Sequence, residues 1–143
     1  MKKYEFTGET KQINIINRTV TLHRIKASVA FGNIKSGDIG GWIEKKENLS
    51  HDGDAWVYGD AQVYSSKHIL LVGPIGSRND YTTFFRNRNR GISVSCGCFL
   101  GEIDKFIEKV IETHGKNKHA SVYRAAAELA KLQIDLSEME EEK

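Results

Sequence analysis

The sequence has little proline, little cysteine and no long hydrophobic run, and each absence excludes a class of protein. One Pro and 13 Gly in 143 residues exclude a collagen-like or proline-rich chain. No apolar run is long enough for a membrane-spanning helix, and the N-terminal segment MKKYEFTGET lacks the apolar core of a secretory signal. The two cysteines, Cys96 and Cys98, are too close in sequence for an ordinary disulfide framework, which favours a reducing compartment. We therefore expect a soluble, cytoplasmic protein.

The net charge is only +2, but the charges are unevenly distributed. Residues 67–124 carry 10 Lys and Arg against 5 Asp and Glu, whereas residues 125–143 carry 2 against 6. No acidic residue lies between Tyr81 and Gly101, yet Arg86, Arg88 and Arg90 fall within five residues. Charge concentrated in one stretch favours a compact anionic partner, and a long nucleic acid, which needs a broader basic face, is not expected.

The first half of the chain has the composition of a β-rich region. Residues 4–45 contain β-branched runs, and a turn is expected at Asn17-Arg18 between two short strands. A repeat of six residues follows, because GDAWVY at 53–58 is succeeded directly by GDAQVY at 59–64. Hexapeptide periodicity is typical of a parallel β-helix. Residues 49–66 comprise three hexads, which suffice for about one coil. This coil is therefore expected to pack against the rest of the chain or against another subunit.

The second half alternates strands and turns and then becomes helical. Strands are expected at 68–75, 81–87 and 92–99, with turns at 76–80 and 88–91. Helical spacing of apolar residues follows, from Ile103 to a stop at Gly115 and from about Ala120 to Ile134. The sequence thus predicts an α+β protein: a β-region with a vestigial hexapeptide coil (1–66), antiparallel strands packed by two α-helices (67–136) and a frayed acidic tail (137–143).

Several motifs carry a resemblance to a family. Residues 37–50 (GDIGGWIEKKENLS), running into the hexads, resemble the opening of uncharacterised phage and prophage proteins of Gram-positive bacteria. GPIGSR at 73–78, SCGCF at 95–99 and THG at 113–115 are similar to the module that follows their β-helical segment. The resemblance implies a left-handed β-helical fold shortened to its end module. Small oligomeric phage proteins of this kind include inhibitors that capture nucleotide signals of bacterial immunity, and by analogy this chain is expected to act as such a sponge.

The residues themselves suggest an anion site. The turn Gly76-Ser77-Arg78 combines backbone N–H groups, a hydroxyl and a guanidinium, which suits a phosphate. On the following strand a period of two places Thr82, Phe84 and Arg86 on one side, where an aromatic ring beside a cation suits a base and its phosphate. The candidate ligand-binding residues are Gly76, Ser77, Arg78, Tyr81, Thr82, Phe84, Arg86, Arg88, Arg90 and Arg124. The alternative is that Phe84 or Phe85 belongs to the core and that the arginines only solubilise a hairpin.

Other chemistries fit the sequence less well. Cys96 and Cys98 with His114 and His119 offer four possible metal ligands, but the spacing of the cysteines does not suit zinc, and no metal is expected. No nucleophile has a His and an acid placed by a catalytic motif, so we expect no enzyme and no cofactor.

The leading hypothesis is a non-enzymatic phage protein that sequesters a small phosphorylated nucleotide in the cytoplasm of the infected host. Large aromatic side chains around an incomplete coil, among them Trp42 and Trp56, lead us to expect a homo-oligomer. A structural or oligomerisation module and an RNA-binding protein remain the alternatives.

Overall fold

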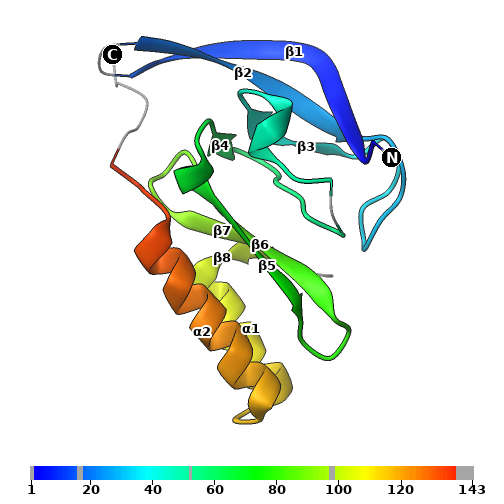
Figure 1. The fold of residues 1–143 in the computed structure, drawn as a ribbon, viewed down its shortest axis with the longest axis vertical. Coiled ribbons are helices and arrows are strands. Elements are labelled where there is room, and N and C mark those ends of the chain that lie inside the picture. Colours follow the sequence, from blue (N-terminus) through cyan, green and yellow to red (C-terminus); the bar gives the residue numbers. More distant parts are fainter. Residues whose placement is uncertain (1, 16–17, 52, 97–98, 138–143) are drawn as a thin grey trace.

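The protein is an α+β structure of three layers. The computed structural model describes residues 2–15, 18–51, 53–96 and 99–137. Over this part of the chain eight strands form two four-stranded sheets, and two helices follow them. The first sheet lies against one face of the second, and the helices cover the other face (Figure 1). The predicted α+β class is confirmed.

The first sheet is built on a long antiparallel hairpin. Strands β1 (Tyr4–Ile15) and β2 (Arg18–Ala27) form it, with an irregularity in the pairing between Phe6 and Thr10. Strand β3 (Ile39–Ile43) pairs antiparallel with β2, and the two-residue strand β4 (Gln62–Val63) pairs parallel with β3. Of the turn predicted at Asn17-Arg18, Asn17 lies outside the described residues and Arg18 begins β2.

The hexads do not form the expected β-helix coil over the described residues of 49–66. Each Gly-Asp pair makes a turn, with positive φ values of 52° at Gly53 and 62° at Gly59. The residues that follow, including Trp56 and Val57, are buried in the core between the two sheets. A single coil has no neighbouring coil to pair with. The repeat is instead absorbed into the first sheet, through β4 and its pairing with β3.

The second sheet is antiparallel throughout, in the order β5-β6-β7-β8. Strands β5 (Ile69–Ile75) and β6 (Asp80–Arg86) lie where strands were predicted. The single strand expected at 92–99 is instead a pair, β7 (Ile92–Cys96) and β8 (Phe99–Glu102), with residues 97 and 98 outside the described part. In the sequence, apolar residues alternate without a break through Cys96 and Cys98. This pattern therefore does not show that the chain reverses direction between β7 and β8.

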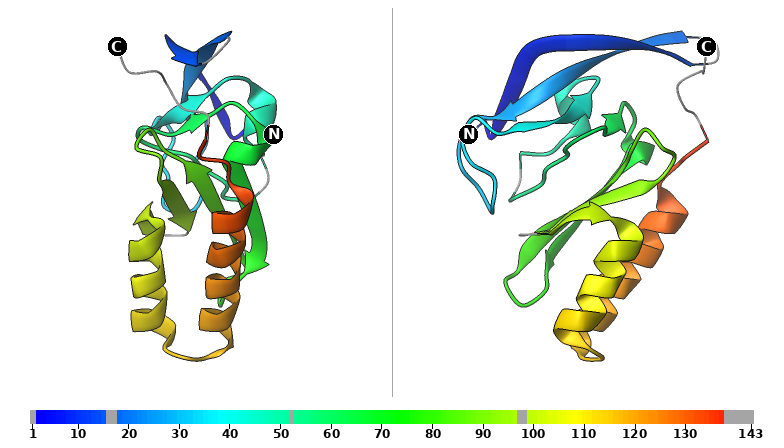
Figure 2. Two further views of the ribbon diagram at one scale, coloured as in Figure 1. Left: turned by 90° about the vertical axis from the view of Figure 1, so that its left-hand side faces the viewer. Right: turned by 180° about the vertical axis from the view of Figure 1, so that it is seen from behind.

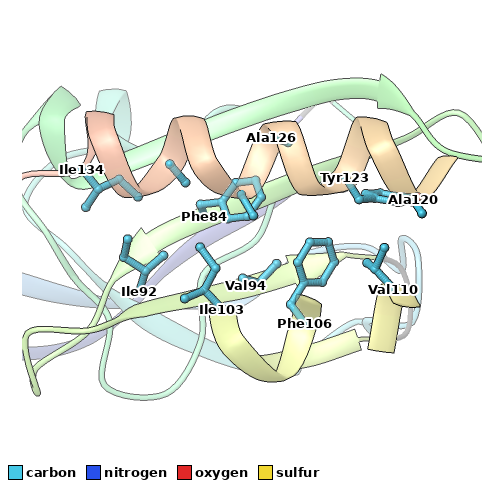
Figure 3. Close-up of a cluster of buried hydrophobic side chains, with 12 residues drawn as sticks. Phe84, Ile92, Val94, Ile103, Phe106, Val110, Ala120, Tyr123, Ala126 and Ile134 are labelled. Carbon is cyan, nitrogen blue, oxygen red and sulfur yellow. The ribbon is translucent and has the colours of Figure 1, made fainter. Parts of the chain in front are cut away.

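The two helices pack on the second sheet, as predicted. They are α1 (Ile103–His114) and α2 (Lys118–Gln133), and a buried cluster joins them to the strands (Figure 3). At its centre the Phe106 ring lies 5.9 Å from Phe84 and 5.7 Å from Tyr123, both in edge-to-face contact. Neither helix is long and apolar enough to cross a membrane.

The other face of the second sheet packs on the first sheet. Phe85 points away from the helices into a cluster that contains Ile25, Ile43 and Trp56. Phe84 and Phe85, adjacent in sequence, are therefore both wholly buried, on opposite faces of β6. The second sheet is therefore the middle layer of the molecule, and residues of its strands that were predicted to bind a ligand are covered on both faces.

Candidate functional site

The predicted arginines do not converge on one point. Ser77 and Arg78 are exposed in the turn between β5 and β6, whereas Arg88 and Arg90 are exposed in the turn at the opposite end of β6. The seven residues of β6 separate these turns by about 20 Å at 3.4 Å per residue. Arg124 is exposed on α2. Within one chain, Arg78 therefore does not form a single phosphate pocket together with Arg86 and Arg88.

The prediction that Phe84 stacks on a base is wrong. Phe84 is 0% exposed beneath the helices and offers no face to a base, because the middle layer is covered on both sides. Thr82 is buried on the same face and lies 3.2 Å from Cys96 Sγ through its hydroxyl. Tyr81 is half-buried, packs over Gly53 and donates its backbone N–H to Asp54 Oδ1 at 3.1 Å. Gly76 lies against the Tyr123 hydroxyl, where a Cβ would not fit.

Arg86 has a different environment from the one predicted. Its side chain is wholly buried, and its guanidinium carbon lies 4.7 Å from the centre of the Tyr64 ring. Arg18, exposed at the start of β2, places its guanidinium carbon 5.4 Å from the same ring. Two guanidinium groups, one from each sheet, thus lie over one aromatic side chain. Contacts of this kind contribute about 0.5–2 kcal/mol, most where water is excluded.

His68 completes the surroundings of Tyr64. The imidazole is 2% exposed, and its Nδ1 accepts the backbone N–H of Tyr64 at 3.2 Å. Burial, and then the charge of Arg86, lower the pKa of His68 to about 4. The ring is therefore neutral at pH 7, and because Nδ1 accepts, its proton is on Nε2. The positive charge around Tyr64 at that pH comes from Arg18 and Arg86.

A cavity of about 650 Å³ opens beside this cluster, between the two sheets. Its lining from the second sheet is Ile69, Leu71 and Thr83, and Arg18 and Tyr64 also face it. The remaining lining consists mainly of polar side chains from two short segments, Lys45, Glu47, Asn48 and Ser50 from one, and Ser65 and Ser66 from the other. The volume lies within the range of small-molecule pockets, about 300–1,000 Å³.

The wall of the cavity at 45–50 is held in place by hydrogen bonds. A 3-10 turn spans Lys46–Asn48. Just before it, the backbone N–H groups of Glu44 and Lys45 both donate to Asn48 Oδ1, at 3.1 and 2.9 Å. From the first sheet, the Tyr4 hydroxyl lies 2.8 Å from the Lys46 carbonyl and 2.7 Å from the Leu49 carbonyl. Burial, with a smaller contribution from Glu47, raises the pKa of Tyr4 to about 12, so the hydroxyl remains a donor. The cavity is thus preformed.

The metal alternative finds little support in the described residues. The rings of His114 and His119 lie 5.6 Å apart, and Cys96 and His114 both line a smaller hollow beside α1. Burial raises the pKa of the Cys96 thiol, which disfavours the thiolate that a metal needs. Cys98 lies outside the described residues, and within the described ranges no three His, Cys, Asp or Glu side chains come together as a metal site.

The candidate residues chosen from the sequence include Arg86, which lies over the Tyr64 ring but does not line the cavity, and they do not include Arg18 or Tyr64, which do line it. No local pattern marks Arg18 or Tyr64, because they meet only where β2, β4 and β6 are packed together. Comparison with known proteins adds no residue to the site, since no family model, curated protein or solved structure matches the chain.

Proposed function

We propose that the protein is a non-enzymatic binding protein that holds a small phosphorylated ligand of the nucleotide class in the cavity between the two sheets. One observation carries the proposal: Arg18 and Tyr64 both line the cavity, and the Arg18 guanidinium lies over the Tyr64 ring. Arg86, which is buried and does not line the cavity, adds a second positive charge over the same ring. Arginine keeps its charge at every physiological pH and binds phosphate with two parallel hydrogen bonds.

The remaining lining suits the rest of such a ligand. Ile69 and Leu71 offer an apolar surface for a base, and the hydroxyls of Ser50, Ser65 and Ser66 are suited to a sugar or to phosphate oxygens. The wall also carries a further cation, Lys45, and one carboxylate, Glu47, which disfavours an anion placed directly beside it.

The ligand class can be narrowed by the resemblance of the chain to phage proteins. A cyclic nucleotide or an ADP-ribose derivative made by bacterial immunity has the size and charge that the cavity accommodates. Sequestration of such a signal would inhibit the defence of the infected cell, with binding alone and no chemical step required of the protein.

The test is calorimetric titration of the purified protein with a panel of cyclic nucleotides, ADP-ribose and short RNA oligonucleotides. We expect at least one small nucleotide to bind, and Arg18→Ala to weaken its binding by tenfold or more, since a charge-assisted hydrogen bond contributes about 1.5–3 kcal/mol. Arg78→Ala is the matched control, because Arg78 is also exposed but lies in the turn between β5 and β6. It is expected to leave the affinity unchanged.

Three outcomes would reject the proposal. Absence of heat with every nucleotide would leave a structural or oligomerisation module. An equal loss of affinity in Arg18→Ala and Arg78→Ala would mean that binding does not occur in the cavity. Affinity that rises with oligonucleotide length and falls steeply with salt would indicate RNA as the ligand.

A further inference from the structure

Helix α2 carries two apolar faces, and only one of them is buried. The buried face comprises Ala120, Tyr123, Ala126, Ala127 and Ala130. A second set of apolar residues consists of Val122, which is half-buried, and Ala125, Leu129 and Leu132, which are exposed, and we name these four residues the α2 seam. Leu129 is 47% exposed and Leu132 is 86% exposed, the highest value among the large hydrophobic side chains of the described residues.

The spacing of the α2 seam is that of a coiled coil. Its four residues are separated by three, four and three positions, which is the alternation of a and d positions in a heptad. A surface helix that only covers a core needs one apolar stripe, so a second one with this spacing is not explained by packing on the sheet. In Figure 2 the two helices lie side by side on the outside of the second sheet, and no other described element covers the outer side of α2.

We propose that the α2 seam binds the α2 seam of a second copy of this chain, with the two helices antiparallel. In a symmetric antiparallel pair centred on residue 127, Leu129 lies opposite Ala125 and Leu132 lies opposite Val122. Each large side chain then meets a smaller one, which is how facing positions fill the space between two helices. A parallel pair would instead place Leu132 against Leu132 and Ala125 against Ala125, which leaves one crowded and one empty layer.

Charge favours the same orientation. The N-terminal end of α2 is basic, with Lys116 just before the helix and Lys118 at its first position, whereas the C-terminal end carries Lys131 in its last turn and Asp135 after it. The antiparallel arrangement keeps the two basic N-terminal ends apart and brings each of them towards Asp135 of the other copy, whereas a parallel pair places the basic ends together. It also opposes the two helix dipoles, whereas a parallel pair aligns them. This interface lies on α2 and is independent of the cavity that Arg18 and Tyr64 line.

The first test is the molar mass in solution, by sedimentation and light scattering over a dilution series. We expect a dimer for the unmodified chain and a monomer for Leu129→Glu/Leu132→Glu. Ile39→Glu is the matched control, because Ile39 is 51% exposed on β3, and it is expected to stay dimeric. Circular dichroism checks that each variant keeps its helices. A monomeric unmodified chain, or a dimer that survives the double substitution, would overturn the proposal.

The second test distinguishes the orientation. In the antiparallel pair the two copies of residue 132 lie about 15 Å apart along the axis, at 1.5 Å per residue, which is too far for a disulfide. Under mild oxidation we therefore expect Val122→Cys/Leu132→Cys to form a covalent dimer and Leu132→Cys alone to form none beyond that of the unmodified chain, which carries its own cysteines. A covalent dimer of Leu132→Cys alone would reject the antiparallel arrangement.

Discussion

At the scale of single residues, the region around Tyr64 is unusual in the polarity of what it buries. Gln62 and Arg86 are 0% exposed and His68 is 2% exposed. The side-chain nitrogen and oxygen of Gln62 have no hydrogen-bond partner among the described residues, and each such buried group costs about 1–3 kcal/mol. A fold selected for stability alone would place apolar residues here. None of the three lines the cavity, but Arg86 and His68 both contact the ring of Tyr64, which does.

His68 makes the stability of the fold sensitive to acid. Its pKa of about 4 in the folded protein lies below the 6.5 of an exposed histidine, so protons bind the unfolded chain first as the pH falls. The contribution of the neutral ring is complete above pH 6.5 and is lost as the pH falls towards 4. The free energy of unfolding is therefore expected to be about 3 kcal/mol lower at pH 4 than at pH 7 from this residue.

The measurement is urea unfolding at both pH values in the unmodified protein and in His68→Asn. The Asn side-chain oxygen can take the place of Nδ1 as acceptor for Tyr64 but does not titrate. We expect the substitution to remove about 3 kcal/mol from the difference between pH 7 and pH 4. If the variant shows the same pH dependence as the unmodified protein, His68 is not the buried neutral group described above.

At the scale of elements, β3 depends on glycine to approach the segment that contains the hexads. A Cβ on Gly40 would lie 2.7 Å from Ile25 Cγ1, 2.7 Å from Trp56 Cζ2 and 2.8 Å from the Val57 carbonyl oxygen. These atoms belong to the core between the sheets and include backbone, so they cannot give way without a shift of the strand. Glycine at this position is what allows β3 to lie against Trp56 and Val57.

Gly40→Ala is expected to destabilise the protein by about 1–3 kcal/mol, the usual cost of overpacking a core. Gly91→Ala is the control, because a Cβ there meets only the Asn87 side chain, 3.2 Å from its Nδ2. Its effect is expected to stay within about 1 kcal/mol, since alanine also restricts the unfolded chain. Thermal unfolding followed by circular dichroism compares the two, and equal melting temperatures would contradict the close packing of β3.

At the scale of the whole molecule, the two sheets share one core although they come from different halves of the sequence. Phe85 of the second sheet is buried among residues of the first, and the backbone N–H of Trp56 donates to Thr83 Oγ1 at 3.2 Å. A bridge between Ala61 and Asn87 joins the backbones as well. The cluster beneath the helices lies wholly within the second half, but removal of either half would expose the shared cluster between the sheets, which contains Trp56 and Phe85. Cooperative unfolding is therefore expected.

Two optical signals separate the halves. Both tryptophans, Trp42 and Trp56, belong to the first half, whereas both helices belong to the second. We expect tryptophan fluorescence and far-ultraviolet circular dichroism to give the same midpoint in urea, as a two-state transition requires. Two separated midpoints would show that residues 1–66 and 67–136 are independently stable units.

The sequence by itself determined the local structure of this protein. The strands at 69–75 and 80–86, the turn between them and the two helices follow from the spacing of apolar residues and from a glycine-containing turn, signals that act over a few residues. Only the tertiary structure decided which strand the hexads pair with. A single coil has no neighbouring coil, so the residues of β4 pair with the edge of β3 instead. The tertiary structure also decided the site. Arg18, Tyr64 and Arg86 are distant in sequence and meet only because the two sheets pack face to face, which no local pattern encodes.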